Sequence, residues 1–330
     1  MSGTEAVMCA TRLARFNTKK KYIVTFGAAY HGWYDAVQPG VGNERPVPDI
    51  IVLNDMSPLS LGVIRARKHE IAGVLVNPLQ AFTPNQPPPS DGTLIGKARD
   101  SGVANAREAF RAWLLKLRAT CTDTGVVLIF DEVYTGFRLS PGGAQEYFDV
   151  KADMVCYGKS AAGGMPIGIV CGPQELMRRF DPDHPLRLCY LVGTFSAHPS
   201  VVTMMKKFLE DVKKVRGGED SQRSSLHCSP FGLTFSLVDR SLLLSSSSQI
   251  DYEKKHSEYS VWVGLMNKVL EERGYPVRLA HFASVWLFQY TQPGRFHWLM
   301  QVRRRGERRT AGAKDGRSEA TAKALYCFPA

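Results

Sequence analysis

Lys159 is the residue whose surroundings in the sequence point most directly to chemistry. It follows the apolar run 154–157 and precedes a glycine-rich turn that contains Gly163 and Gly164. At the end of a buried strand, desolvation and nearby positive charge lower the pKa of a lysine, so its amine can form a Schiff base with a carbonyl cofactor. Taken alone, the same pattern also fits an ordinary turn with an exposed lysine.

Asp131 follows residues 126–130, the most apolar run of the chain. If this run is a parallel strand, the carboxylate lies at the edge of the sheet where ligands of α/β folds bind. An isolated acid in such a position is more often a helix cap or part of a surface turn. Together with Lys159, however, Asp131 fits pyridoxal phosphate, which needs a lysine for attachment and an acid beside its ring nitrogen.

Ser2, Gly3 and Thr4 stand at the start of an expected helix. Exposed N–H groups and the positive end of the helix dipole favour a phosphate there, and the hydroxyl groups add donors. A capping box without any ligand is the alternative. Tyr30 and His31 precede a glycine, and an aromatic ring in this place could stack on a flat cofactor, although such pairs more often serve packing alone.

These candidate residues must be positioned by a fold in which strands and helices alternate. Short apolar runs typical of buried parallel strands are separated by stretches of helical periodicity. The expected strands are residues 22–26, 50–53, 72–76, 126–130, 154–157, 167–171 and 284–290, and the expected helices are residues 5–16, 57–68, 105–121, 173–180, 199–215 and 257–273. The pattern predicts an α/β fold with a mostly parallel central sheet covered by helices on both faces.

Changes in composition along the chain predict four regions. Residues 1–215 form a large domain that contains all the candidate residues named above. Residues 216–251, which include a serine run, are predicted to be an irregular insertion. Residues 252–301 form a partial small α+β domain. Residues 302–330 carry eight Lys or Arg against three Asp or Glu, which is typical of a basic, disordered tail.

The composition also limits the classes of protein. The net charge of +11 invites a nucleic-acid partner, but the basic tail supplies much of it without interleaved aromatic residues, so we expect none. Seven cysteines without CxxC pairs favour a reducing compartment and argue against a structural zinc site. There is no signal peptide, and no apolar run approaches the roughly 20 residues that cross a bilayer. We therefore expect a soluble cytoplasmic protein without membrane contact, or a plastid protein if a transit peptide is missing.

Four segments, in this order, resemble the signature of class III aminotransferases of fold type I. They are Ser2-Gly3-Thr4-Glu5-Ala6, Tyr30-His31-Gly32, the run Phe130-Asp131-Glu132-Val133-Tyr134-Thr135-Gly136-Phe137-Arg138, and the stretch from Tyr157 through Lys159 to Gly168. Within this class the sequence is most similar to the glutamate-1-semialdehyde 2,1-aminomutases, also at residues 143–148 and 193–199. The resemblance covers residues 2–214 and is weaker at 252–301.

The resemblance implies a role for each matching residue. Lys159 would attach pyridoxal 5'-phosphate and transfer the proton between substrate carbons, while Asp131 would hold the ring nitrogen protonated. The other cofactor-binding residues implied are Ser2, Gly3 and Thr4 at the phosphate, Tyr30 on the ring, His31, Val133, and Thr194, which would reach the phosphate of a neighbouring subunit. A homodimer acting on a small amino or keto substrate is therefore expected.

Two departures from the family separate the alternatives. Asn77 stands where the family usually has a glutamate. The segment around Asn77 resembles instead that of related aminotransferase modules of polyketide and peptide synthases, which aminate β-ketoacyl chains. Relatives also have a further segment before the one that resembles Ser2, so we expect an N-terminally truncated chain.

The leading interpretation is an aminomutase-like transfer of an amino group. An intermolecular aminotransferase and an inactive truncated homologue are the alternatives, and the lack of an early GxGxxG disfavours a nucleotide-dependent oxidoreductase.

Overall fold

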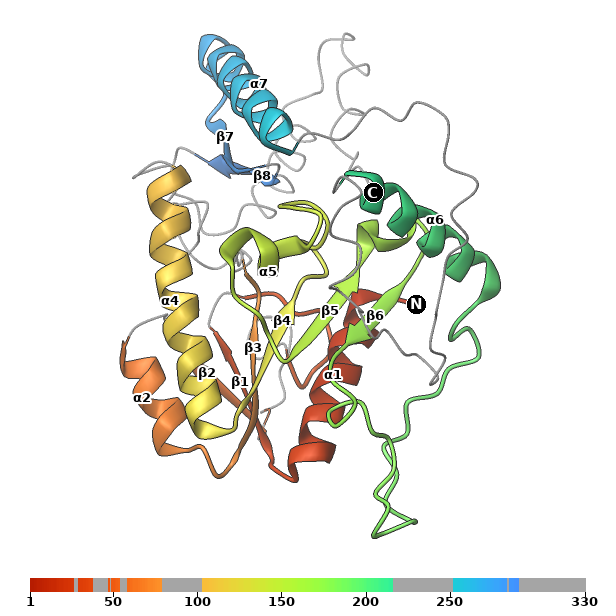
Figure 1. Cartoon of the computed structure of the whole chain (residues 1–330). Coiled ribbons are helices and arrows are strands. Elements are labelled where there is room, and N and C mark those ends of the chain that lie inside the picture. Colours follow the sequence, from red (N-terminus) through yellow and green to blue (C-terminus); the bar gives the residue numbers. More distant parts are fainter. Residues whose placement is uncertain are drawn as a thin grey trace, which may run out of the picture.

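The computed structural model describes residues 1–26, 29–37, 47, 49–53, 58–78, 103–215, 252–283 and 285–290. In these ranges a mixed sheet carries helices on both faces, and a helix with a two-stranded hairpin forms a further layer (Figure 1). None of the helices in the described ranges combines the length and apolar character that a bilayer span requires.

The central sheet has six strands in the order β2-β1-β3-β4-β5-β6. They are β1 (Tyr22–Phe26), β2 (Ile50–Leu53), β3 (Ile71–Val76), β4 (Val127–Asp131), β5 (Met154–Gly158) and β6 (Gly168–Cys171). Strands β1 to β5 run parallel to one another, and β6 pairs antiparallel with β5. This arrangement confirms the predicted α/β fold with a mostly parallel sheet.

Strand side chains are buried under helices on both faces of the sheet. On β3, Val74 and Val76 belong to one core cluster, and Ala72 and Leu75 belong to the other. The first cluster includes residues of α2 (Pro58–Ala66) and α4 (Val103–Thr124), and the second includes residues of α1 (Gly3–Thr18). The helices thus lie on opposite faces, as Figure 1 shows. A strand buried on both sides requires a continuous apolar sequence.

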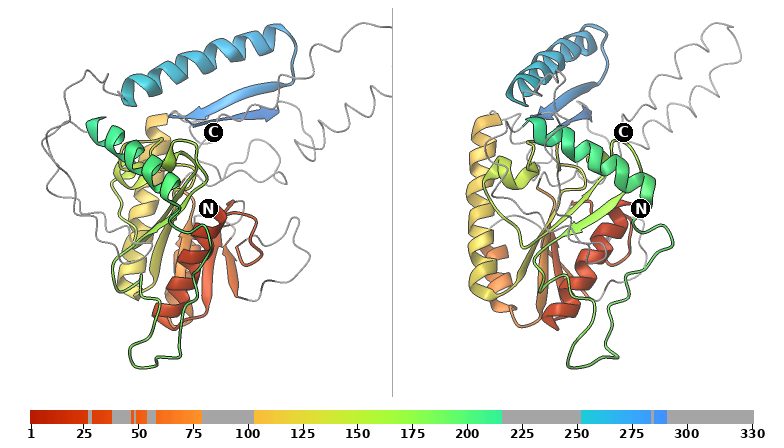
Figure 2. Two further views of the ribbon diagram at one scale, coloured as in Figure 1. Left: turned by 90° about the vertical axis from the view of Figure 1, so that its right-hand side faces the viewer. Right: turned by 45° about the vertical axis from the view of Figure 1, so that its right-hand side comes forward.

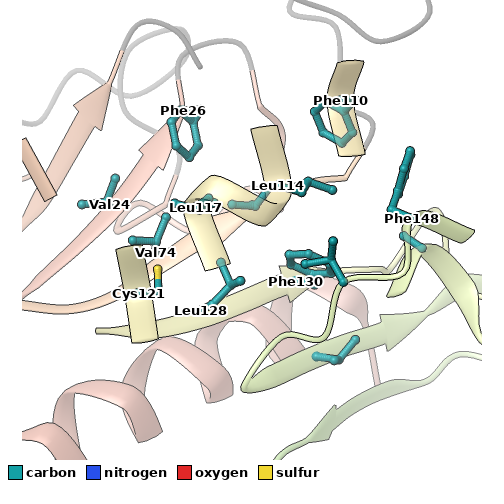
Figure 3. Packing of buried hydrophobic residues seen from close by; sticks show 14 of the residues in the cluster. Val24, Phe26, Val74, Phe110, Leu114, Leu117, Cys121, Leu128, Phe130 and Phe148 are labelled. Carbon is teal, nitrogen blue, oxygen red and sulfur yellow. The ribbon is translucent and has the colours of Figure 1, made fainter. Parts of the chain in front are cut away.

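One part of the core lies between α4 and the middle of the sheet. Leu114 and Leu117 of α4 are fully buried against Leu128 and Phe130 of β4 and Val74 of β3 (Figure 3). Burying each such side chain contributes about 1.5–3 kcal/mol relative to leaving it exposed. Because Phe130 directly precedes Asp131, this core fixes the position of the strand end that carries the acid.

A helix–hairpin layer packs on the end of the domain near the short helix α5 (Gly143–Phe148) (Figure 2). It consists of α7 (Tyr252–Glu272), β7 (Val277–Phe282) and β8 (Val285–Tyr290). The Phe282 ring stacks on Phe148, with ring centroids 6.3 Å apart, and meets Tyr147 edge-on. The predicted insertion at 216–251, the end of the partial small domain at 291–301 and the predicted tail at 302–330 lie outside the described residues.

One expected helix is wrong. Residues 173–180 form turns that lead into an isolated bridge between Phe180 and Leu188. The side chain of Asn17 in α1 donates hydrogen bonds to the carbonyl oxygens of Leu176 and Arg178, at 2.9 and 3.0 Å. These carbonyls are therefore bonded to a neighbouring element instead of accepting bonds within a helix.

Candidate active site

The candidate residues are brought together by the carboxyl ends of three adjacent parallel strands. β3 ends next to Asn77, β4 ends at Asp131, and β5 ends immediately before Lys159. The register pairs Val76 with Phe130 and Asp131 with Cys156, so the three ends lie at one edge of the sheet. Ligands of open α/β sheets bind outside this edge.

A buried His–Asp pair forms the centre of the site. Asp131 and His31 are 3% and 1% exposed, and His31 Nδ1 lies 2.8 Å from Asp131 Oδ2. The other carboxylate oxygen accepts a hydrogen bond from the backbone N–H of Val133 at 3.1 Å. His31 Nε2 is also buried and has no hydrogen-bond partner among the described residues. A buried carboxylate needs such partners, because leaving it without them is costly.

Lys159 lies directly beyond β5, at the start of the 3-10 helix η1 (Lys159–Ala162). Its φ of 46° is uncommon for a residue other than glycine, and such conformations cluster at functional sites. The ammonium nitrogen is 5.5 Å from the centre of the Tyr134 ring. Desolvation by neighbouring groups lowers the pKa of Lys159, the charge of Asp131 opposes this effect, and the charge of Arg138 adds to it.

The amino end of α1 packs against the same loops. Ser2 caps the helix, and its hydroxyl oxygen accepts a hydrogen bond from the N–H of Glu5. A Cβ at Gly3 would lie 2.9 Å from a Val133 methyl carbon, so only glycine allows this approach. Gly32 has a φ of +96°, and a Cβ there would lie 2.6 Å from the Thr4 hydroxyl oxygen. The helix amino end therefore adjoins both the His31 loop and the turn after Asp131.

Two predicted residues are less closely tied to this centre. The Tyr30 side chain is 47% exposed, and its carbonyl oxygen makes a long 3.5 Å contact with the side-chain nitrogen of Asn77. Thr194 is exposed in a turn that precedes α6 (Pro199–Val215), and the structure describes no contact between it and Asp131 or Lys159. The remaining predicted residues, Ser2, Gly3, Thr4, His31, Asp131, Val133 and Lys159, surround the strand ends.

Glu132 is a residue of the site region to which the sequence analysis gave no role. It is 1% exposed, and its carboxylate accepts hydrogen bonds from the backbone N–H groups of Ala144 and Gln145, at 2.6 and 3.2 Å, and from the Thr135 hydroxyl. Burial raises the pKa of Glu132 to about 7, even though these hydrogen bonds act in the opposite direction. Its position directly beside Asp131 was the available signal.

Comparison with known proteins finds a family match over the part of the chain that carries Asp131 and Lys159. Residues 100–224, which include Asp131 and Lys159, match the family model for class-III aminotransferases. This part of the chain is similar to a class-III aminotransferase domain. Among curated proteins, it is 38% identical over 231 residues to a glutamate-1-semialdehyde 2,1-aminomutase of Hydrogenobaculum sp. (64% of this chain, 48% of that protein). It is 35% identical over 228 residues to the aminomutase of Aquifex aeolicus (64% and 48%).

Solved structures of this class share the fold. An ω-transaminase from Sphaerobacter thermophilus superposes with a TM-score of 0.58 at 24% identity, covering 88% of this chain and 58% of that one. A glutamate-1-semialdehyde aminomutase from Pseudomonas aeruginosa gives 0.57 at 18% identity, with 89% and 57% covered. These likenesses confirm the predicted fold of pyridoxal-phosphate-dependent class III transaminases. The chain spans about half the length of the curated relatives it matches.

Proposed function

We propose that this chain catalyses the transfer of an amino group with pyridoxal 5'-phosphate as cofactor. The observation that carries the proposal is a buried His31–Asp131 pair at the end of β4, with Lys159 at the end of the adjacent strand. The class-III aminotransferase domain match, which includes Asp131 and Lys159, supports the same chemistry.

The residues present fit the cofactor. Asp131 retains acceptor capacity beyond its bonds to His31 and Val133, so it would bind a protonated ring nitrogen. The amino end of α1, with Ser2, Gly3 and Thr4, would bind the phosphate, because N–H groups there have no partner within the helix. When bound, pyridoxal phosphate supplies an electron-accepting ring that stabilises negative charge on the substrate carbon.

The protein's own groups would then perform three tasks. His31 holds the Asp131 carboxylate in one orientation within the buried end of the sheet. Lys159 provides the amine that attaches the cofactor and afterwards accepts and returns a proton at its Nζ, which its lowered pKa favours. Tyr30, which follows β1 and precedes His31, would cover the ring of the cofactor. Val133 would contact the cofactor through its position between Asp131 and Gly3.

An aminomutase-like reaction, in which one substrate exchanges its own amino group, is the form that we favour. Curated relatives at 35–38% identity carry the name glutamate-1-semialdehyde 2,1-aminomutase. An intermolecular aminotransferase is the second candidate, because the buried amide of Asn77 lies at the edge that would face the substrate. An amide binds a neutral or β-ketoacyl group without the charge of a glutamate, so Asn77 is the residue that favours this second candidate.

A homodimer would complete the site. The segment around Thr194 exposes several large apolar side chains, which is typical of surfaces that other subunits cover. These side chains are Leu186, Leu188, Tyr190, Val192 and Phe195. In such a dimer, Thr194 would reach the phosphate bound by the partner subunit.

The proposed function is tested by offering the purified chain pyridoxal phosphate and two sets of substrates. Glutamate 1-semialdehyde alone would be converted by an aminomutase, whereas an aminotransferase would need a keto substrate together with an amino donor. Lys159→Ala is the matched inactive control. If the cofactor-loaded chain converts neither set, or if Lys159→Ala retains the activity, the proposal is wrong.

A further inference from the structure

The turn that follows Asp131 packs directly against the segment that carries Lys159. Ser160, which follows Lys159 in η1, donates a hydrogen bond from its hydroxyl to the Gly136 carbonyl oxygen at 3.2 Å. The Phe137 ring lies 5.3 Å from the Tyr157 ring at the end of β5. The turn and the start of η1 therefore form one packed unit, and a side chain of the turn has a defined position relative to Lys159.

Within this unit, one aromatic ring adjoins two cationic side chains. The guanidinium carbon of Arg138 lies 4.9 Å from the centre of the Tyr134 ring, and Lys159 Nζ lies 5.5 Å from the same centre. Arg138 also donates a hydrogen bond to the Tyr134 carbonyl oxygen at 2.9 Å, which keeps the guanidinium beside the ring. Both cations are within the roughly 6 Å over which a ring face attracts positive charge.

The two cations are not equivalent. Arginine stays charged at all accessible pH values, whereas a lysine can lose its proton. The described charged groups that act on Lys159 are Asp131, which favours the ammonium form, and Arg138, which disfavours it. Asp131 is already engaged by His31 and by the Val133 N–H. Desolvation is the main effect that favours the neutral amine, the charge of Asp131 opposes it, and the fixed positive charge of Arg138 adds to it.

We propose, on the basis of the role given to Lys159 above, that Arg138 is a positioning residue whose fixed charge, held beside the Tyr134 ring that Lys159 also adjoins, disfavours the ammonium form of the lysine. Arg138 itself takes no part in bond making. Its effect is that, at a given pH, a larger fraction of the amine is neutral and can attack a carbonyl compound. The sequence motif that ends in Arg138 belongs to the family resemblance, but the role proposed here rests on the shared Tyr134 ring.

The test measures the reactivity of Lys159 without any cofactor. The chain is labelled with trace acetic anhydride across a range of pH, and acetylation of Lys159 is quantified by mass spectrometry relative to exposed Lys206 of α6. In Arg138→Gln, labelling of Lys159 below its titration midpoint should fall about threefold, because the lysine loses a neighbouring charge that disfavours its protonation. Arg138→Lys retains a positive charge and should show a smaller fall. Arg111→Gln, which removes an arginine that is paired with Asp149 instead, should show none.

The outcomes separate this inference from the proposed function. A labelling profile that is the same in Arg138→Gln and in the unchanged chain, with circular dichroism also unchanged, overturns the role of Arg138. If Arg138→Gln does not fold, Arg138→Met keeps the apolar stem and is measured in its place. Failure of the chain to attach pyridoxal phosphate at Lys159 would overturn the proposed function instead, because the labelling contains no cofactor.

Discussion

His31 and Asp131, which are a hundred residues apart in the sequence, form a buried hydrogen-bonded pair with 2.8 Å between Nδ1 and Oδ2. The pair lies where the loop after β1 meets the end of β4. A carboxylate in this position depends on the imidazole for one of its hydrogen bonds, because water is excluded from both side chains.

Replacing the histidine should therefore cost stability and weaken cofactor binding. His31→Ala leaves Asp131 Oδ2 without this partner, and we expect the free energy of unfolding to fall by about 1–3 kcal/mol. Denaturant titration measures this loss, and equilibrium dialysis measures the affinity for pyridoxal phosphate. His69→Ala, which alters an exposed histidine in a turn, is the control and should change neither. A His31→Ala protein of undiminished stability and affinity would contradict the role of the pair.

Neutralising the acid itself should affect turnover more than folding. Asp131→Asn retains the shape of the side chain but removes the negative charge that would hold a protonated ring nitrogen. Charged groups of this kind commonly contribute about 3 kcal/mol to the transition state, so kcat should fall by about two orders of magnitude. Steady-state kinetics of the cofactor-loaded protein provide the measurement. Unchanged turnover would remove Asp131 from the proposed mechanism.

The close approach of α1 to the His31 loop depends on a glycine at position 32. Gly32→Ala forces a side chain onto a φ of +96° and toward the Thr4 hydroxyl oxygen, so phosphate binding at the amino end of α1 should weaken. Gly62→Ala is the matched control, since its Cβ would meet nothing within 4 Å in α2. Isothermal titration with pyridoxal phosphate should show at least a tenfold loss of affinity for Gly32→Ala alone. If the two variants bind pyridoxal phosphate with equal affinity, the close approach of Gly32 to Thr4 is not needed for cofactor binding.

The raised pKa of Glu132 predicts that the stability of the folded protein depends on pH. Its pKa is raised from 4.5 to about 7 in the folded protein, so the folded state binds a proton that the unfolded state releases. The contribution of Glu132 to stability is therefore fully present below pH 4.5 and is lost as pH rises through 7. Unfolding measured between these values should show stability falling by at most about 1.4 kcal/mol per pH unit from this group.

Glu132→Gln should remove that part of the pH dependence. An amide does not titrate in this range, so the stability of the variant should no longer fall from this cause as the pH rises toward 7. Glu108→Gln, whose side chain is 72% exposed, should keep the original profile. If the Glu132→Gln and Glu108→Gln profiles coincide, Glu132 does not titrate in this range.

The strand ends could be predicted from the sequence because they follow continuous apolar runs. The run before Asp131 and the run before Lys159 became adjacent parallel strands, and the helix predicted at residues 5–16 is α1. Periodicity is a local property, so it located the elements from which these residues project. The adjacency of Asp131 and Lys159 followed from the rule that parallel strands end at one edge.

What could not be predicted depends on contacts between distant segments. The short helix α5 has no apolar period of its own, and its backbone N–H groups are bonded to Glu132. The helix expected at residues 173–180 was wrong because Asn17 binds carbonyl groups of that segment. The Tyr134 ring beside Arg138 and Lys159 likewise depends on how the turn folds back over β5.

Attachment of the cofactor to Lys159 can be measured by borohydride reduction. The chain is incubated with pyridoxal phosphate, reduced and digested, and the pyridoxyl group is located by peptide mass spectrometry. We predict modification at Lys159 and none in the Lys159→Ala protein. Lys151→Ala, which alters an exposed lysine before β5, should be modified as in the unchanged chain. A pyridoxyl group on another lysine, or equal modification of the Lys159→Ala protein, would contradict this prediction.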